Sequence, residues 1–460
     1  MKRYFTALLA LLLTTSFAGC AGDTTSDVSD SVGTSAGTEP PLESGELLIW
    51  YDTCSKDIMM GLITEFQREY PGIEVITEDY SEMIIPDYRT KLAGELMAGG
   101  GPDIVLSNHD NNNIVQNLTK LLQNGIFLDV NTLGVDFSDC NQAVLASGVY
   151  EGGQYMVPLN YSLGFLLSSQ ERIDDYGLVC DGDLASFAAS LSSVYNAGNL
   201  VFSDIFTIEF LYFQNGMSLM DYENQTLNAS EEELIQLKQA AEAYDKLFPR
   251  IFTDNNALAE YQLFIRRLHE YDGSLPNAFF SEDLTLYCSP GLVGSYDDIR
   301  LMRPVCEELQ MQGQTPYLTR LPTVDGGAPS PVPNWFLLVN SKTEHTREAA
   351  CFIQSAIGMD SQYHVSGQAA ITINNSLIEC MRTYYCDGVK DANYVFPEHN
   401  IPEDVCKYYF DQIASMQPGV YTDVQTMGHL FGVFREYLTG TDFDIAYDHA
   451  KNNVSFYLSE

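Results

Sequence analysis

The sequence predicts an α/β fold in which helices cover a parallel sheet. Apolar runs of strand length alternate with helical segments from residue 46 to residue 106. Hydrophobic residues make up 45% of the 460 residues and charged residues only 19%, so the chain has enough apolar side chains for a core. The 63 Asp and Glu residues outnumber the 23 Lys and Arg residues, giving a formal net charge of −40. This balance excludes a nucleic-acid binder, because such a protein needs a basic face.

The N-terminal half of the fold follows from the spacing of its apolar residues. Pro71 and Gly72 end the first helix, and a glycine run over 99–101 leads into the third strand. Open parallel sheets bind ligands beyond the carboxyl ends of their strands, which here are residues 50–52 and 107–110. The expected elements are strands at 46–51, 73–78 and 103–106 and helices at 56–70 and 87–98.

The rest of the chain carries further helix and strand signals. Ser230 followed by Glu233 forms a capping box at the start of a helix. Residues 336–340 (FLLVN) predict a strand, and residues 346–356 predict the helix after it. The stretch 402–458 is expected to be mostly helical, with breaks near 418–419 and 439–440.

The N-terminus has the features of a secretory signal. Lys2 and Arg3 precede an apolar run that is too short for a permanent membrane span, and small residues follow it. The segment resembles a bacterial lipoprotein signal, although Phe17 stands where Leu is usual. We therefore expect residues 1–19 to be removed, Cys20 to be lipidated, and residues 20–45 to form a disordered tether outside the cytoplasm. The alternative is an ordinary secretory signal with an incidental Cys20.

The cysteines give no metal site. Nine remain after Cys20, with no CxxC pair and no His at ligand spacing, which argues against zinc. Cys380 and Cys386 are the closest pair in sequence and could form a short disulfide in an extracellular setting. Buried thiols are the alternative interpretation of both residues.

Several short motifs in a fixed order resemble one protein family. They are the lipoprotein-like signal, the tether, ELLIWY, AGGGPDIV at 98–105, GQYMVP at 153–158, the segment 340–352 and the closing LTG at 438–440. In this order they resemble the extracellular solute-binding proteins of ATP-binding-cassette (ABC) importers. Within that group the chain resembles the sugar-binding family that includes maltose-binding protein. The resemblance covers residues 46–460.

The resemblance implies a two-lobed, periplasmic-binding-protein-like α/β fold with a ligand cleft between the lobes. Chain crossings would lie at 157–159 and 329–333. In such proteins the lobes close on the ligand by hinge motion, and the ligand must contact both lobes to favour the closed state. The implied lobe 1 is residues 46–159 with 330–375, and the implied lobe 2 is residues 160–329 with 376–460.

The resemblance also implies ligand-binding residues from both lobes. Sugar rings stack on aromatic planes, while Asp and Asn side chains bind the hydroxyls that a closed cleft removes from water. Tyr296 stands where Trp is frequent in the family, and Asn334 stands where Gly is common. The implied ligand-binding residues are Trp50, Tyr51, Asn108, Asp110, Tyr161, Ser295, Tyr296, Asn334 and Trp335.

Structural roles are the alternative for several of these residues. Aromatic residues form 12% of the chain, so each aromatic candidate could be a core residue. Asn108 and Asp110 could cap a helix beginning near Asn112. Asp103 is expected to order the turn before its strand, and the glycine run lacks the GK[ST] ending of a phosphate loop.

The predicted function is capture of a solute, namely a carbohydrate such as an oligosaccharide, for delivery to an ABC transporter permease. We expect a monomer that has no cofactor, metal or catalytic residue and that meets the membrane only through its lipid. A cationic solute such as a polyamine is the alternative, which would require carboxylates converging in the cleft. A secreted glycoside hydrolase is a further alternative, which would need a pair of catalytic carboxylates. No HExxH motif is present, and the seven His residues form no metal spacing.

Overall fold

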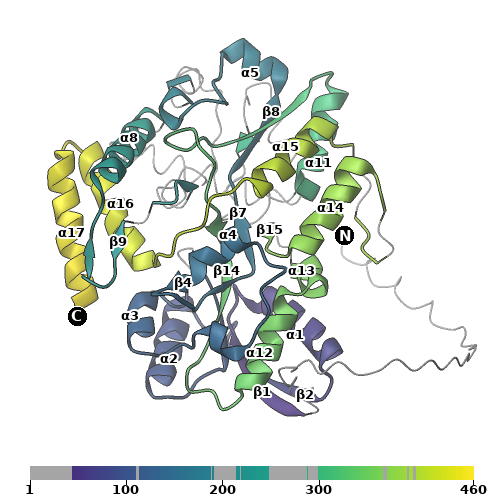
Figure 1. Ribbon diagram of the computed structural model, residues 1–460, viewed down its shortest axis with the longest axis vertical. Coiled ribbons are helices and arrows are strands. Elements are labelled where there is room, and N and C mark those ends of the chain that lie inside the picture. Colours follow the sequence, from purple (N-terminus) through teal and green to yellow (C-terminus); the bar gives the residue numbers. More distant parts are fainter. Residues whose placement is uncertain are drawn as a thin grey trace, which may run out of the picture. The chain divides into compact units, whose positions relative to one another are not determined.

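The structure is a computed structural model (Figure 1) with alternating helices and strands, as the sequence predicts. The numbering of its elements follows the figure. It describes residues 44–109, 113–187, 189–190, 214–217, 219–247, 287–288, 299–365, 370–390, 393–396 and 400–459.

The largest sheet in the described chain has five strands in the order β2-β1-β3-β14-β6. The strands β1, β2 and β3 are parallel, and β14 runs antiparallel to both β3 and β6. The three strands predicted first are confirmed, but β3 extends two residues further because Ser107 and Asn108 pair with Phe336 and Trp335. The bounds are β1 Gly45–Tyr51, β2 Ile73–Asp79, β3 Ile104–Asn108, β6 Val157–Pro158 and β14 Trp335–Val339.

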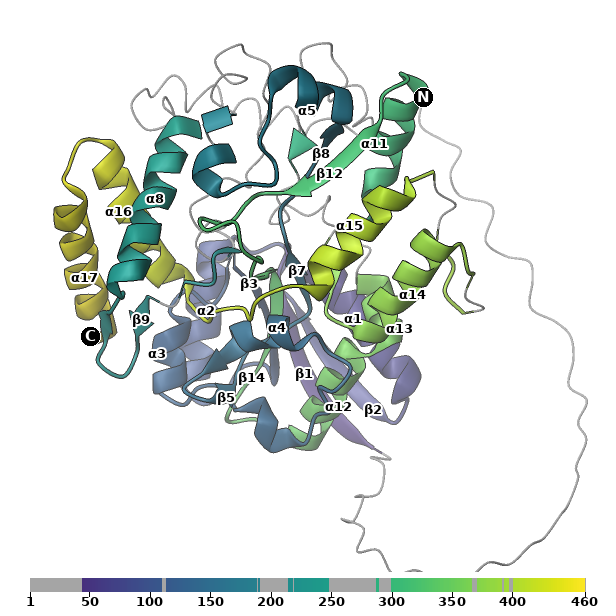
Figure 2. The same ribbon diagram turned by 45° about the horizontal axis from the view of Figure 1, so that its top comes forward.

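Helices cover both faces of this sheet (Figure 2). Side chains alternate along β1, so Ile49 packs with α1 and α12, whereas Trp50 packs with α2 and α3 on the other face. The helix α2 begins at Ile85 rather than at the predicted residue 87, because Pro86 is well tolerated in the first turn of a helix. The helices are α1 Lys56–Glu69, α2 Ile85–Met97, α3 Leu118–Gln123 and α12 Thr346–Ile357.

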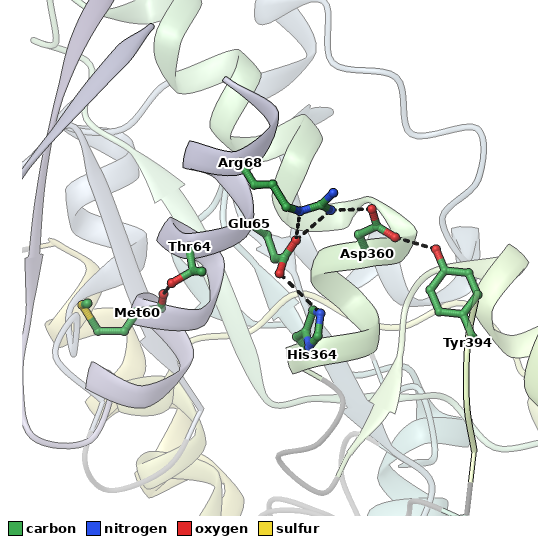
Figure 3. Close-up of polar contacts among 7 residues, drawn as sticks. All are labelled: Met60, Thr64, Glu65, Arg68, Asp360, His364 and Tyr394. Atoms are coloured by element: carbon green, nitrogen blue, oxygen red, sulfur yellow. Dashed lines mark hydrogen bonds and ion pairs between the residues drawn. The ribbon is translucent and has the colours of Figure 1, made fainter. Parts of the chain in front are cut away.

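A polar network on the surface fastens α1 to α13 (Figure 3). Arg68 lies 2.8 Å from Glu65 and 2.5 Å from Asp360, and the Tyr394 hydroxyl donates to Asp360 at 2.6 Å. His364 adds a 3.3 Å contact to Glu65. The hydrogen bond from Tyr394 and the Arg68 guanidinium lower the pKa of Asp360. The helix α13 spans Met359–Val365.

Two further three-stranded sheets follow the first. One has the order β13-β7-β15 and the other β11-β8-β12. In the second sheet, β12 pairs with β8 over five residues, and α15 packs against β12. The bounds are β7 Asn160–Ser162, β8 Phe165–Ser169, β11 Tyr287–Cys288, β12 Pro316–Arg320, β13 Val332–Pro333, β15 Ile371–Thr372, α5 Gln170–Tyr176, α11 Ile299–Met311, α14 Asn375–Asp387 and α15 Glu403–Ala414.

The C-terminal helices pack with the middle of the chain. The helices α16 and α17 contact each other, α16 contacts α8, and α17 contacts β10. The capping box is confirmed, since the Ser230 hydroxyl accepts from the Glu233 amide at 3.2 Å and Glu233 accepts from the Ser230 amide at 2.8 Å. The predicted helix breaks are confirmed as well. The bounds are α8 Glu231–Leu247, α16 Val424–Leu438, α17 Phe443–Ser459, β9 Met220–Asp221 and β10 Thr226–Leu227.

Short elements join the first sheet to β7. The hairpin β4-β5 leads to β6. Just before α4, Cys140 and Asn374 pair through an isolated antiparallel β-bridge. Cys380 and Cys386, both on α14, are not joined by a disulfide bond. The bounds are η1 Val130–Leu133, α4 Gln142–Leu145, η2 Ala146–Gly148, β4 Val149–Tyr150 and β5 Gly153–Gln154.

Candidate functional site

Four predicted ligand residues lie at one edge of the main sheet. The parallel strands β1 and β3 end there with Trp50, Tyr51 and Asn108, and the antiparallel strand β14 begins there with Trp335. Asn108 and Trp335 are direct partners across the β3–β14 ladder. The amide of His109 donates to the carbonyl of Asn334 at 3.2 Å, which extends this pairing by one step.

The strand β7 brings a second group of polar residues to this edge. Tyr161 pairs with Pro333, and Ser162 pairs with Val332. The Asn160 side chain accepts from the Trp335 amide at 3.0 Å, and the Asn160 carbonyl accepts from the Asn334 amide at 3.0 Å. Hydrogen bonds therefore connect the Asn108–Trp335 pair directly to β7.

The Asn334 side chain is fixed by a hydroxyl on β7. Its amide nitrogen donates to the Ser162 hydroxyl at 3.0 Å, and both side chains are buried. The sequence did not single out Asn160 or Ser162, although both flank the predicted site residue Tyr161. The one sequence signal that could have identified these two residues is their position directly after the predicted crossing at 157–159.

Several buried polar atoms at this edge have no hydrogen-bond partner within the described ranges. They include the Oδ1 atom of Asn108, the Nδ2 atom of Asn160 and the Nε1 atom of Trp50. These residues are 5%, 1% and 6% exposed, so bulk water does not readily replace the missing partners. Burial of an unpaired polar group costs roughly 1–3 kcal/mol. The Asn108 acceptor and the Asn160 donor suit a ligand rich in hydroxyl groups, since each hydroxyl both donates and accepts.

The aromatic candidates differ in how they are packed. Trp335 is partly exposed, whereas Trp50 and Tyr161 are buried. The Trp50 ring lies 5.1 Å from the Tyr80 ring, and the Lys91 ammonium lies 5.0 Å from the Trp50 ring centroid. Of these three aromatic residues, Trp335 is the one with part of its side chain accessible.

Tyr51 faces the other side of the sheet from Trp50. It belongs to the core cluster of α1 and α12, and the Lys56 ammonium lies 5.8 Å from its ring centroid. Trp50 and Tyr51 therefore do not present their rings to one common surface.

The neighbouring ionisable groups have structural roles. Burial lowers the pKa of His109 to about 4, so this imidazole is neutral at pH 7. The Asp52 carboxylate accepts from the Ser55 amide at 2.8 Å at the start of α1. Asp103 accepts from the Leu48 amide at 2.7 Å and also from the Thr343 hydroxyl, which confirms its predicted role in ordering the turn.

The glycine run before β3 forms the predicted turn. Gly99 and Gly101 have φ angles of 81° and 85°, which L-residues with side chains rarely adopt. Four predicted site residues, Cys20, Asp110, Ser295 and Tyr296, lie outside the described residues. Within the described ranges, no group of His, Cys, Asp and Glu is placed to hold a metal ion. The same ranges hold no helix with both the length and the hydropathy needed to cross a bilayer.

Comparison with known proteins assigns the fold. A scan of protein-family models finds no match, and a search of the curated proteins finds none either. A putative oligosaccharide periplasmic-binding protein from Synechococcus sp. MITs9220 is 16% identical, with a TM-score of 0.60 over 90% of this chain and 99% of that chain. The GacH receptor of Streptomyces glaucescens, solved unliganded and with acarbose, is 16% identical, with a TM-score of 0.55 over 91% of this chain and 99% of that chain. The chain has the two-lobed fold of extracellular solute-binding proteins.

Further solved structures agree with this fold. An ABC substrate-binding protein of Listeria monocytogenes in complex with cycloalternan is 15% identical, with a TM-score of 0.53 over 90% of this chain and 99% of that chain. The fold class predicted from the sequence is therefore confirmed. Designed esterases are also among the matched structures, so the solute-binding-protein fold alone does not assign an activity.

Proposed function

We propose that this chain is a substrate-binding lipoprotein that captures an uncharged carbohydrate, namely an oligosaccharide, outside the cytoplasm. It delivers this solute to the permease subunits of an ABC importer and catalyses no reaction itself. The proteins of similar fold supply the precedent for the ligand class, since they are a putative oligosaccharide-binding protein, a receptor solved with acarbose and a substrate-binding protein in complex with cycloalternan. Cys20 carries the lipid that holds the protein at the membrane.

One observation carries the choice of ligand class. The sheet edge formed by β3, β7 and β14 holds buried amides at Asn108 and Asn160 beside the partly exposed Trp335. The amides offer an acceptor and a donor to hydroxyl groups, and the indole offers an apolar plane to a sugar ring. This combination supports a neutral polyhydroxylated ligand.

The described part of this edge does not favour a cationic solute. Such a solute needs two or more carboxylates that point into the cleft. Asp52 is the acidic residue that follows β1, and backbone amides at the start of α1 already occupy its carboxylate. Asp52 is therefore engaged by the protein's own backbone and does not supply one of the carboxylates that the polyamine alternative needs.

In the proposed mechanism, the lobes are residues 46–159 with 330–375 and residues 160–329 with 376–460. The crossings between them are residues 157–159, which include β6, and residues 329–333, which include β13. The ligand contacts Asn108 and Trp335 from lobe 1 and Tyr161 from lobe 2. Its binding energy to both lobes then stabilises the closed form, which is the form that the permease accepts.

A thermal-shift screen of carbohydrates and polyamines tests this proposal. A ligand at one hundred times its dissociation constant stabilises the folded protein by about 2.7 kcal/mol. For lobes of about 200 residues this raises the melting midpoint by roughly 5 to 10 °C. The correct oligosaccharide should also reduce the radius of gyration and remain intact on long incubation. A shift caused by polyamines alone, or hydrolysis of the sugar, would contradict the proposal.

A further inference from the structure

Asn334 uses its polar groups differently from the other two asparagines of the candidate site. Asn108 and Asn160 each leave one buried side-chain atom without a partner within the described ranges. The Asn334 side chain, in contrast, is occupied by Ser162. Its Nδ2 atom donates to the Ser162 hydroxyl at 3.0 Å, and its Oδ1 atom lies 3.3 Å from the same hydroxyl. A solute would have to break this contact before it could bind the Asn334 side chain.

The main chain of Asn334 is occupied as well. Its amide donates to the Asn160 carbonyl at 3.0 Å, and its carbonyl accepts from the His109 amide at 3.2 Å. Asn334 therefore joins the end of β3 to β7, and its side chain adds a second link to β7 through Ser162. This pattern is typical of a residue that supports a site rather than of one that binds a ligand.

Asn334 and Ser162 lie next to residues that the proposed function uses. Trp335 follows Asn334 in the chain, and Asn160 lies two residues before Ser162 on β7, so the side chains of Asn160 and Ser162 point to the same side of that strand. The Asn160 Oδ1 atom accepts from the Trp335 amide at 3.0 Å. Two hydrogen bonds that involve side chains therefore link the same two segments. In both views β7 lies between β14 and β8 (Figures 1 and 2).

Both side chains of the Ser162–Asn334 contact are shielded from water. Ser162 is 0% exposed and Asn334 is 8% exposed. When one of the two groups is removed, water does not readily replace it, and the other group is left unpaired. The contact therefore helps to hold β7 against the start of β14, where Asn160 meets Trp335.

We propose that Ser162 and Asn334 form a positioning pair, which holds Asn160 and Trp335 in the arrangement that binds the solute but does not touch the solute itself. This inference rests on the proposed function. It gives Asn334 a different role from the ligand contact that the family resemblance implies. A binding site needs its contact residues fixed by neighbouring hydrogen bonds, because a small displacement misaligns the bonds to the ligand. Loss of the pair should displace the Asn160 Nδ2 donor relative to the Trp335 ring.

A double-mutant cycle in the full-length protein tests this role. Ser162→Ala, Asn334→Ala and the double variant are titrated by calorimetry with acarbose, with which the GacH receptor was solved. Each single change should weaken binding roughly 2- to 13-fold, the range for one misaligned neutral hydrogen bond. The double variant should bind no more weakly than either single variant, because each change alone already breaks the pair. If the two effects instead add, at least one of the residues contacts the solute directly, and the proposal is wrong.

A second measurement needs no solute. Hydrogen exchange at the Trp335 amide, which donates to Asn160, should be faster in Ser162→Ala than in the unchanged protein. Ser147→Ala on η2 is the matched control. Ser147 is also 0% exposed, and its hydroxyl donates to the Val144 carbonyl at 2.7 Å. The control should lose stability and leave exchange at Trp335 unchanged.

Further variants of Ser162 keep the test decisive. Ser162→Thr retains the hydroxyl and should restore slow exchange at the Trp335 amide. If Ser162→Ala does not fold, Ser162→Cys replaces the hydroxyl with a thiol, which is a weak donor and a weak acceptor. A lower melting midpoint with unchanged exchange at Trp335 in a folded variant would overturn the proposal. Failure of the unchanged protein to bind any carbohydrate would instead contradict the proposed function, and the exchange measurement alone would then decide whether the pair positions Trp335.

Discussion

Replacing Asn160 by Asp should reveal which kind of solute this site binds. Asn160 is 1% exposed, and its Oδ1 atom accepts from the Trp335 amide at 3.0 Å. Asp has nearly the same shape and keeps this acceptor, but it replaces the donor Nδ2 with a second, charged oxygen. A neutral sugar should therefore bind more weakly to Asn160→Asp at pH 7, and a cationic solute should bind more tightly.

The structure sets the size of each effect. Asn160→Ala leaves the Trp335 amide unsatisfied, which should cost roughly 1–3 kcal/mol of stability. Loss of one neutral hydrogen bond from Nδ2 to a sugar hydroxyl should weaken binding by about 0.5–1.5 kcal/mol, or roughly 2- to 13-fold in the dissociation constant. In Asn160→Asp, burial should raise the pKa of the new carboxyl. Its destabilising effect should therefore be present at pH 7 and decrease as the pH falls.

The assay is titration calorimetry at pH 7 with the oligosaccharide found in the thermal-shift screen, and with spermidine as the cationic probe. Asn340→Asp is the matched control. Asn340 is also buried, lies just beyond the far end of β14, and donates to the Gly100 and Pro102 carbonyls at 2.9 Å and 3.1 Å. The control should lose stability but keep its affinity per folded molecule. Unchanged sugar affinity in both Asn160 variants would refute the assignment of Asn160 to the site.

Three further predictions concern the aromatic residues, the anchor and the surface network. Trp335→Ala and Tyr161→Ala should each weaken ligand binding by about 1 to 3 kcal/mol in calorimetry, and unfolding at unchanged affinity per folded molecule would instead identify a core residue. Cys20→Ser should move the folded protein from the membrane fraction to the medium, and continued membrane retention would exclude the lipid anchor. Because the folded-state pKa of Asp360 is lowered, its stabilising effect is present above the unfolded pKa near 4 and is lost as the pH falls further. Tyr394→Phe should therefore lower the unfolding free energy by less than about 1 kcal/mol at pH 7 and by almost nothing at pH 3, as measured by urea denaturation.

Local sequence signals predicted the elements of the main sheet well. Apolar periodicity and turn residues placed β1, β2, α1 and α12 to within one or two residues. The end of β3 was predicted too early because Ser107 and Asn108 are polar and look like loop residues. Their strand conformation comes from pairing with β14, which is more than 200 residues away in the sequence.

The candidate site was harder to predict than the fold. The sequence predicted both Trp50 and Tyr51 as ligand-binding residues, but the alternation of side chains along β1 places them on opposite faces of the sheet. Nothing in the sequence singles out Asn160, because its importance comes from one hydrogen bond that its side chain accepts from the Trp335 amide. Such contacts depend on the three-dimensional pairing of β7 with β13, which no local pattern encodes.

The acidic composition says little about the solute. Within the described part of the chain, the buried acidic residues are Asp52, Asp103 and Asp423. Each one accepts at least one backbone N–H: Asp52 from Ser55 at 2.8 Å, Asp103 from Leu48 at 2.7 Å and Asp423 from Thr426 at 2.7 Å. These carboxylates hold helix starts and turns, and the other described acids lie at least partly in solvent, where salt screens their fields. The net charge of −40 therefore does not point to a cationic ligand, and the buried amides at Asn108 and Asn160 are the better guide to what binds.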